Sequence, residues 1–188
     1  MKSSGCTPTS IDPIKWPASA IVSLPATRYS SPDQLADFYS RVVETLKATP
    51  GVLGAAAAVG LPMSGFSPRA PYQVEGRPIL PLAQRPFAQL NIVTEDYFSV
   101  LRIALASGRG FTSADRRGAP NAAVVNEAFA KRVFPGESAL GKVLLRGPKL
   151  KIRAQIVGVI HDVKALGLNV PSSAHFHERM LGQGRRFG

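Results

Sequence analysis

The clearest pattern of apolar and polar positions lies near the N-terminus, between Ser31 and Pro50. Apolar residues recur there at the spacing of one helix face, at Leu35, Phe38, Tyr39, Val42, Val43 and Leu46. Ser31 is a favourable N-cap, Pro32 suits the first helical position, and Gln34 completes the spacing of a capping box. Pro50 and Gly51 end the pattern. We therefore predict an amphipathic helix between Ser31 and Pro50.

Short apolar runs follow this helix and predict strands. The predicted strands are Val52–Val59, Tyr72–Glu75, Phe87–Val93, Ala122–Val125, Lys142–Leu145 and Arg153–Asp162, with short helices over Glu95–Leu101 and Asn126–Val133. The Pro- and Gly-rich stretch from Leu61 to Pro86 predicts a junction between lobes or a mobile loop. A mixed sheet with packed helices, followed by a smaller strand-rich lobe, is an α+β fold.

Charge adds one competing hypothesis to this picture. The 188 residues include 23 Lys and Arg against 12 Asp and Glu, which gives a net charge of +11. Such a charge attracts nucleic acid or anionic lipid. The cations are scattered, however, with their densest groups at 146–153 and 179–186, and aromatic residues do not alternate with them as a base-stacking surface requires. We expect a solvated basic surface and no nucleic-acid partner; a stand-alone nucleic-acid-binding domain is the alternative.

The chain offers no pattern of a membrane-spanning or secretory segment. Its longest apolar stretch, Val52 to Met63, contains Gly54, Gly60 and Pro62 and falls short of the roughly 20 residues that a spanning helix needs. The N-terminus lacks the apolar region of a signal peptide. A single cysteine, Cys6, excludes an intrachain disulfide. Any placement outside the cytoplasm would depend on sequence beyond this chain.

One motif imitates a phosphate-binding loop. Residues from Gly136 to Val143 have the spacing G-x-x-x-x-G-K, but Val143 stands where a P-loop has a Ser or Thr for magnesium. The predicted order is also reversed, because a helix precedes the loop and a strand follows it. We expect an ordinary turn between Phe134 and Val143 with Lys142 exposed, and no cofactor.

The residues that could support metal or acid–base chemistry have structural explanations. His161 is expected at a strand end, and His175 and His177 cannot supply the three or four ligands that zinc needs. Glu95, Asp96, Asp115 and Glu127 fit helix starts and turns, and Asp162 ends a predicted strand. No serine lies in a G-x-S-x-G elbow. We expect no metal site, no catalytic residue and no enzyme; a small hydrolase is a further alternative.

An ordered series of short motifs runs through most of the chain. It comprises Leu24-Pro25, Tyr29, Phe38-Tyr39, Pro50–Val52 and Leu61-Pro62, then Tyr97-Phe98, the pattern GR-x-F-T-x-x-D from Gly108 to Asp115, Val124–Glu127, Phe134–Gly136, Leu140–Lys142, Ile156–Val159 and Asp162-Val163. In this order the motifs resemble the extracytoplasmic core domain of MacB-like and FtsX-like ABC transporter permeases. The resemblance covers roughly residues 21–171. It implies a core domain of two lobes, preceded by a divergent leader without stable structure (1–20) and followed by a divergent basic tail (172–188).

The resemblance also implies a function. Such domains stand at the periplasmic face of the cytoplasmic membrane, and they transmit conformational change between partners or substrates without catalysing a reaction. Their partners are a second permease copy, an ATPase subunit or domain, and periplasmic proteins. Membrane association would come only from helices outside this chain. Arg109, Phe111 and Asp115 of the central loop are the residues predicted to contact a partner, with the alternative that they only fix a turn.

Overall fold

The computed structural model describes residues 18–25, 27–62, 64, 66, 68–116, 118–163 and 172–180. Most of the predicted leader, with Cys6, lies outside these residues, and so does the end of the predicted tail. The elements are α1 (Pro32–Lys47), β1 (Arg69–Val74), the 3-10 helix η1 (Leu82–Gln84), β2 (Phe87–Val93), α2 (Tyr97–Val100), β3 (Leu105–Gly108), β4 (Asn121–Asn126), α3 (Glu127–Val133), β5 (Val143–Arg146), β6 (Ile152–Ile160) and β7 (His175–Arg179).

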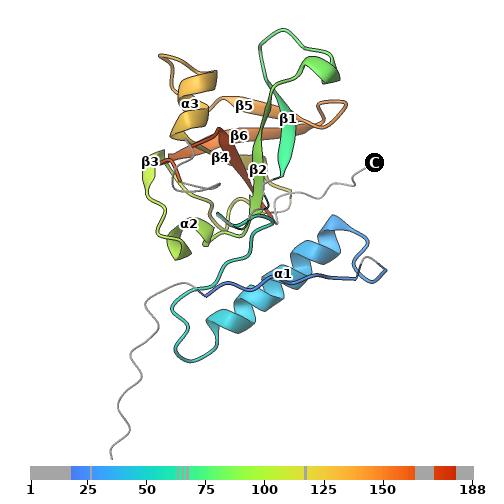
Figure 1. The fold of residues 1–188 in the computed structure, drawn as a ribbon, viewed down its shortest axis with the longest axis vertical. Helices are drawn as coiled ribbons and strands as arrows, with labels where there is room; N and C mark the ends of the chain where they lie inside the picture. Colours follow the sequence, from blue (N-terminus) through green and yellow to red (C-terminus); the bar gives the residue numbers. More distant parts are fainter. Residues whose placement is uncertain are drawn as a thin grey trace, which may run out of the picture.

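The seven described strands form one mixed sheet that closes on itself (Figure 1). Their order is β3-β6-β4-β7-β2-β1-β5, and β5 pairs again with β6. Six strands therefore make a closed ring, while β3 extends the sheet from the C-terminal half of β6. The pairs β4–β6 and β2–β7 are parallel, and the others are antiparallel. The α+β class with a mixed sheet is thus confirmed.

The ring is filled by a cluster of apolar side chains, called here the inner cluster. Every strand of the ring contributes to it, and α3 adds Phe129 and Val133. Its other members include Tyr72, Val74, Ala88, Ala123, Val125, Leu144, Ala154, Ile156 and Phe176. Three aromatic rings meet at its centre, with the centroid of Tyr72 lying 5.1 Å from that of Phe129 and 6.2 Å from that of Phe176. α3 is held over this core because the Asn126 side chain caps it by accepting from the Phe129 N–H.

A second cluster, called here the outer cluster, lies on the opposite face of the sheet. It consists of Val93, Tyr97, Phe98, Phe111, Ala122, Val124 and Ile160. Neighbouring residues of β4 alternate between the two clusters, since Ala123 and Val125 point inward while Ala122 and Val124 point outward. α2 and the loop after β3 cover this outer face.

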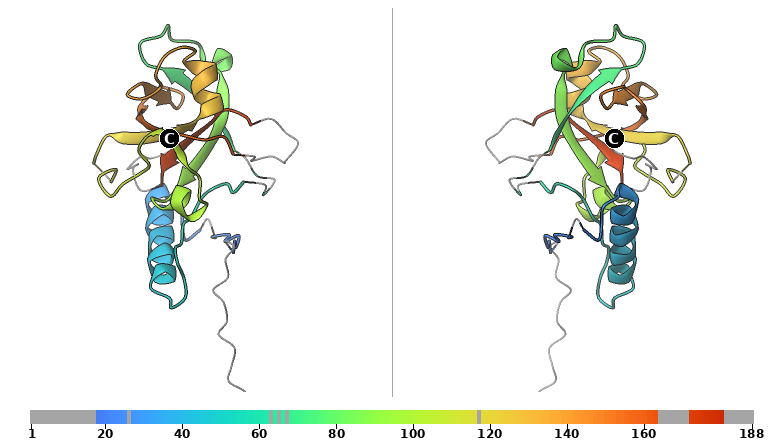
Figure 2. Two further views of the ribbon diagram at one scale, coloured as in Figure 1. Left: turned by 90° about the vertical axis from the view of Figure 1, so that its left-hand side faces the viewer. Right: turned by 90° about the vertical axis from the view of Figure 1, so that its right-hand side faces the viewer.

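Helix α1 lies to one side of the closed sheet, as Figures 1 and 2 show. Its predicted capping box is present, with Gln34 N–H donating to Ser31 Oγ at 3.2 Å and Ser31 N–H donating to Gln34 Oε1 at 3.2 Å. The Tyr39 hydroxyl donates to the Val22 carbonyl at 3.2 Å, which holds the preceding segment against the helix. Lys47, at the helix end, forms an ion pair with Asp96 next to α2.

Three parts of the predicted secondary structure need correction. Val52–Val59 is not a strand: among these residues only Ala58 bridges to the sheet, at Val93. Its run of Ala and Gly has low strand propensity. β3 (Leu105–Gly108) was not predicted, because it is short and begins with an irregular register against β6. Nor was β7 (His175–Arg179), which falls in the stretch predicted as a divergent tail, so a boundary at residue 171 removes a central strand of the sheet.

The Pro- and Gly-rich stretch from Leu61 to Pro86 is also more ordered than its composition predicts. It contains β1 and η1, and the Arg85 side chain fastens it to the loop after β5 through the carbonyl groups of Gly147 (3.0 Å) and Pro148 (3.2 Å). β1 belongs to the same sheet as every other described strand. A division of the core into two lobes stays a prediction.

Candidate functional site

The predicted contact residues lie on the loop that follows β3, and two of them pair with each other. Arg109 NH1 and NH2 donate to the Asp115 carboxylate at 2.7 and 2.8 Å, a bidentate arrangement. The Thr112 backbone N–H donates to the same carboxylate at 2.8 Å. Burial alone would raise the pKa of Asp115, but the hydrogen bonds from Arg109 and Thr112 outweigh it, and the pKa lies below its usual range. Asp115 is therefore ionised at neutral pH.

Phe111, the third predicted residue, points inward. Its side chain belongs to the outer cluster and stacks on Phe98, with ring centroids 5.8 Å apart. Arg109 is the partly open member of the three, with 46% of its side chain exposed. The structure thus brings the three residues together, and their contacts hold the loop in shape. Contact with a partner stays a prediction.

Two glycines let this loop lie directly on β6. Gly108 has φ +72, and a Cβ there would come within 2.4 Å of the Val157 carbonyl oxygen. A Cβ on Gly158 would come within 2.0 Å of the Arg109 carbonyl oxygen. Both contacts are with backbone, which cannot swing away as a side chain can. The close approach positions Arg109 beside Asp115.

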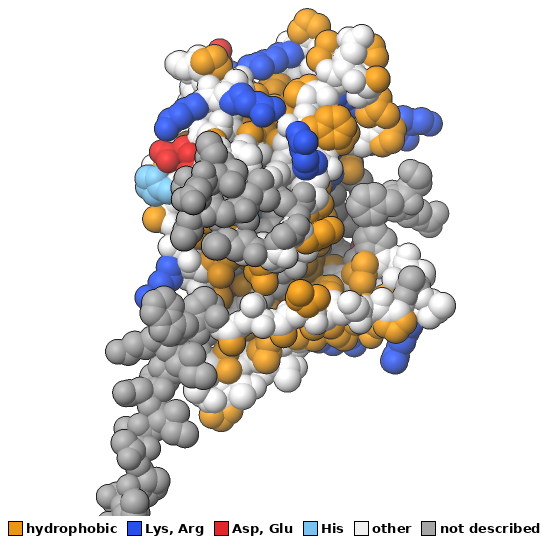
Figure 3. Space-filling model, viewed as in Figure 1, with side chains coloured by type: hydrophobic (Ala, Val, Ile, Leu, Met, Phe, Trp, Pro, Cys, Tyr) orange, Lys and Arg blue, Asp and Glu red, His pale blue; other side chains and the backbone are white. Residues whose placement is uncertain are grey.

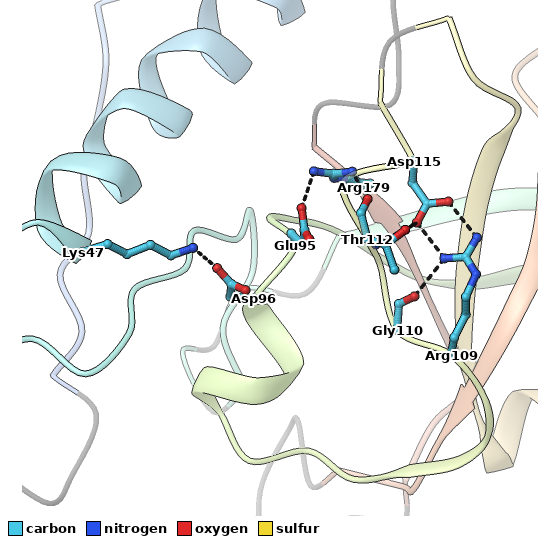
Figure 4. A network of polar contacts seen from close by, with 8 residues as sticks. All are labelled: Lys47, Glu95, Asp96, Arg109, Gly110, Thr112, Asp115 and Arg179. Atoms are coloured by element: carbon cyan, nitrogen blue, oxygen red, sulfur yellow. Dashed lines mark hydrogen bonds and ion pairs between the residues drawn. The ribbon is translucent and has the colours of Figure 1, made fainter.

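Residues from three other elements extend this loop into a polar network that crosses the molecule (Figure 4). Arg179 of β7 donates to the Thr112 carbonyl, and it pairs with Glu95 Oε2 at 2.6 Å. Glu95 precedes Asp96, the partner of Lys47 in α1. The polar network is defined here as Lys47, Asp96, Glu95, Arg179, Thr112, Asp115 and Arg109. It connects α1, the turn before α2, the centre of the sheet and the loop after β3.

Most groups of the polar network are paired, but Arg179 Nε is buried without a hydrogen-bond partner. The Arg179 side chain is 8% exposed and its partner Glu95 is 36% exposed, whereas both members of the Lys47–Asp96 pair are partly exposed. From the sequence, Glu95 and Asp96 are predicted at a helix start, and Arg179 only as a member of the basic group in the tail. Glu95 and Arg179 lie 84 residues apart, and no local pattern could have connected them.

Other motifs adopt structures close to those predicted. Lys142 in the P-loop-like stretch is partly exposed and pairs with Glu137 at 2.7 Å, after helix α3 and before strand β5. His161 follows β6, and its Nδ1 lies 3.3 Å from the Glu127 carboxylate. Across the described residues, no group of three or more His, Cys, Asp or Glu side chains could hold a metal ion.

On the face of the molecule seen in one direction, the basic side chains form no single stripe. On the face shown in Figure 3, Lys and Arg side chains stand apart, with hydrophobic and uncharged side chains between them. Some arginines form hydrogen bonds with the backbone of the same domain. Arg77 donates to the Val133 carbonyl at 2.7 Å, and Arg132 donates to the Phe87 carbonyl at 3.1 Å. None of the helices that the structure describes is long and apolar enough to cross a membrane.

Comparison with known proteins identifies the class to which this fold and loop belong. The profile of the MacB-like periplasmic core domain matches residues 12–180, which includes the loop after β3 and strand β7. The chain therefore belongs to the MacB-like periplasmic core domain family. The predicted extracytoplasmic location is confirmed at the level of this family, since its domain is periplasmic.

Curated relatives are similar over a shorter stretch. The probable syringafactin export ATP-binding/permease protein SyfD of Pseudomonas syringae pv. tomato is 40% identical over 80 residues, which are 42% of this chain and 12% of that protein. The probable export ATP-binding/permease protein MacB of Pseudomonas entomophila is 39% identical over 79 residues, 42% of this chain and 11% of that protein. The chain thus spans about a tenth of each relative's length.

Two solved structures share the fold. The periplasmic region of MacB from Actinobacillus actinomycetemcomitans is 18% identical with a TM-score of 0.53, over 77% of this chain and 56% of that one. The extracellular domain of YknZ, an ABC-type transporter from Gram-positive bacteria, is 18% identical with a TM-score of 0.50, over 76% of this chain and 63% of that one. At this identity the likeness concerns the fold alone.

Proposed function

We propose that this chain is a non-catalytic domain of a MacB- or FtsX-type ABC transporter permease that contacts partners or substrates and transmits conformational change. The family and the names of its relatives, which are export ATP-binding/permease proteins, support this role. The polar network supports the proposed transmission of conformational change, because it joins helix α1, at one side of the domain, to strand β7 in the middle of the closed sheet.

Transmission would follow the contacts in order. A displacement of α1 moves Lys47, and the ion pair of Lys47 with Asp96 then pulls on the turn before α2. Glu95 in the same turn holds Arg179 at 2.6 Å, and Arg179 is the last residue of β7. The hydrogen bond from Arg179 to the Thr112 carbonyl passes this displacement to the loop after β3, which the Arg109–Asp115 pair keeps rigid. A shift at one side of the domain would thereby reposition the predicted contact loop.

The proposed partners are those of an export system. They are a second permease copy, an ATPase subunit or domain, and periplasmic proteins that meet the loop carrying Arg109, Phe111 and Asp115. Arg109 offers the chemistry for such a contact, because its guanidinium is half exposed while Asp115 fixes its orientation. An acidic or carbonyl-rich surface would suit it.

Hydrogen exchange of the backbone tests the transmission. Replacing Arg179 by Met removes the contacts with Glu95 and Thr112, so exchange is expected to rise several-fold both in the turn at 94–96 and in the loop at 109–115. Replacing Lys47 by Met is expected to raise exchange at the C-terminal end of α1 and at Asp96. Arg153→Met is the matched control, because it removes an exposed pair with Glu75 elsewhere on the sheet.

The result that contradicts the proposal is a purely local response. If Arg179→Met changes exchange only in β7, the polar network does not couple its parts. In a MacB-type permease that carries this domain, the same substitution is expected to lower export while leaving the amount of protein in the membrane unchanged. Unaltered export would show that the polar network does not transmit conformational change, even if its contacts exist.

A further inference from the structure

A small pocket lies on the outer face of β2 and β7, beside the outer cluster. Its polar walls are Gln89 and Asn91 of β2, Asn126 of β4, His175 and His177 of β7, and Tyr97 of α2. Leu61, Phe66 and Ile103 are among its apolar walls. The cavity volume is about 40 Å³, room for about three waters at the 10–15 Å³ that each needs by this measure. The pocket is therefore large enough for one functional group with a short apolar body.

The pocket is uncharged in a chain that is strongly basic. Its lining residues, all within the described ranges, include no Lys, Arg, Asp or Glu. Burial is the main cause that lowers the pKa of His175. Burial together with the nearby His175 lowers the pKa of His177 to about 3, although an interaction of its ring with the Val124 backbone opposes this lowering. Burial also raises the pKa of the Tyr97 hydroxyl to about 12. At neutral pH both imidazoles and the phenol are uncharged.

Part of the pocket's wall is held firmly by hydrogen bonds. Asn91 Oδ1 accepts from the Gly60 N–H at 3.0 Å, and Asn91 Nδ2 donates to the Gly60 carbonyl at 2.7 Å and to the Tyr97 hydroxyl at 3.2 Å. His175 Nδ1 lies 2.7 Å from the Ser173 carbonyl. These contacts fix the loop at Gly60, the helix α2 and strand β7 around the same space.

Two other polar atoms of the wall have no hydrogen-bond partner. Gln89 Oε1 and His177 Nδ1 are both buried and unpaired, on side chains that line the pocket. Buried polar atoms in native proteins almost always have partners, so two orphaned atoms in one pocket indicate that something else supplies them. An amide oxygen can only accept a hydrogen bond, and an imidazole nitrogen accepts when the ring proton is on the other nitrogen.

We propose that this pocket binds a neutral hydrogen-bond donor, a hydroxyl or primary carboxamide group on a small apolar body. The donor group bonds to Gln89 Oε1 and His177 Nδ1, and the apolar body packs against Leu61, Phe66 and Ile103. Charged groups are excluded, because none of the lining side chains could neutralise them and the pocket would strip their water. This site does not depend on the proposed transport role.

Titration with simple probes tests the site. Ethanol and acetamide carry the required groups in three and four heavy atoms, which suits a cavity of about 40 Å³, whereas ethylammonium and acetate have similar shapes with a charge. With histidine rings labelled by ¹³C, the neutral probes are expected to shift the His177 resonances saturably, with a roughly millimolar Kd for ligands of about four heavy atoms. The charged probes are expected to leave these resonances unchanged at the same concentrations.

Replacing Gln89 tests whether the bound probe donates a hydrogen bond to its side chain. Gln89→Met keeps the length of the side chain but removes the acceptor, and it is expected to weaken binding about tenfold, the ratio that loss of one hydrogen bond produces. Gln155→Met on β6 is the control, since Gln155 lies outside the pocket, and its Kd should match that of the unaltered chain. The titration itself keeps the proposal testable if Gln89→Met does not fold.

Three outcomes would overturn the proposal. The first is that neutral probes cause no shift up to about 20 mM, well above the roughly millimolar Kd expected for them; the orphaned atoms then bind water only. The second is equal binding of acetate or ethylammonium, which would show that the pocket does not exclude charged groups. The third is unchanged affinity in Gln89→Met, which would locate the probe elsewhere.

Discussion

The most unusual residues of this domain are two charges inside its sheet. Glu178 of β7 is 1% exposed and makes a bidentate ion pair with Arg146 of β5, itself almost fully buried. The Arg146 guanidinium also lies over the Phe176 ring, 5.8 Å from its centroid. In an apolar interior each charge depends on the other, because neither can regain the water that folding removes.

Removing one member of this pair should therefore cost more than removing both. Glu178→Ala is expected to lower the free energy of unfolding by about 3–5 kcal/mol, since it leaves an uncompensated buried cation. The double variant Arg146→Met with Glu178→Leu should recover much of that loss. Urea unfolding followed by circular dichroism measures both. Arg153→Met, which breaks the exposed pair with Glu75, should change stability by less than about 1 kcal/mol.

A buried histidine makes stability depend on mildly acid pH. Burial, with a contribution from His175, lowers the pKa of His177 to about 3 in the folded chain, below its ordinary 6.5. The unfolded chain therefore binds this proton first, so the stabilisation is complete above pH 6.5 and is lost as pH falls toward 3. Between pH 6.5 and 5 the loss from His177 alone is about 2 kcal/mol.

Urea unfolding at pH 7 and pH 5 measures this dependence. The variant His177→Phe has no proton to take up at this position, so its stability should fall less between the two pH values than that of the unaltered chain. An equal fall in both would show that His177 is not the responsible group.

At the scale of elements, the sequence predicts structure that depends on neighbouring residues, but not structure that depends on pairing with a distant strand. The capping box of Ser31 and Gln34 operates within one turn, and α1 was therefore predictable from its own residues. β2 was predicted with the bounds that the structure shows, because its apolar run is strong. Val52–Val59 has a similar apolar content but gains only one bridge. Whether a segment becomes a strand depends on a neighbour that the segment itself does not specify.

The contact between the loop after β3 and strand β6 gives a sharp prediction at this scale. In Gly158→Ala the new Cβ would meet the Arg109 carbonyl oxygen, so β6 and the loop must separate. We expect a loss of about 1–3 kcal/mol or more in the free energy of unfolding. Gly110→Ala is the matched control in the same loop, since a Cβ there has nothing within 4 Å. Thermal unfolding compares the two, and equal melting temperatures would contradict the close approach.

At the scale of the whole molecule, the family was recognisable from the order of its motifs, whereas the closure of the sheet was not. Arg109, Phe111 and Asp115 could be found because they fall within eight residues of one another. The rest of the polar network could not, because Lys47 and Asp96 lie 49 residues apart and Glu95 and Arg179 lie 84 apart. Strand β7 was overlooked because its alternating sequence is mostly polar, and only the closed sheet reveals that these polar side chains are buried.

The position of β7 has a consequence for how the chain folds. β7 is the last of the described strands in sequence, yet it lies between β2 and β4, which do not pair with each other in the sheet order. Until residues 175–179 leave the ribosome, β2 and β4 each present an unpaired edge, and the place of Phe176 in the inner cluster is empty. Folding must wait for contacts between distant parts of the chain, which are slow to form. A nascent chain stalled before β7 would be the form most exposed to aggregation.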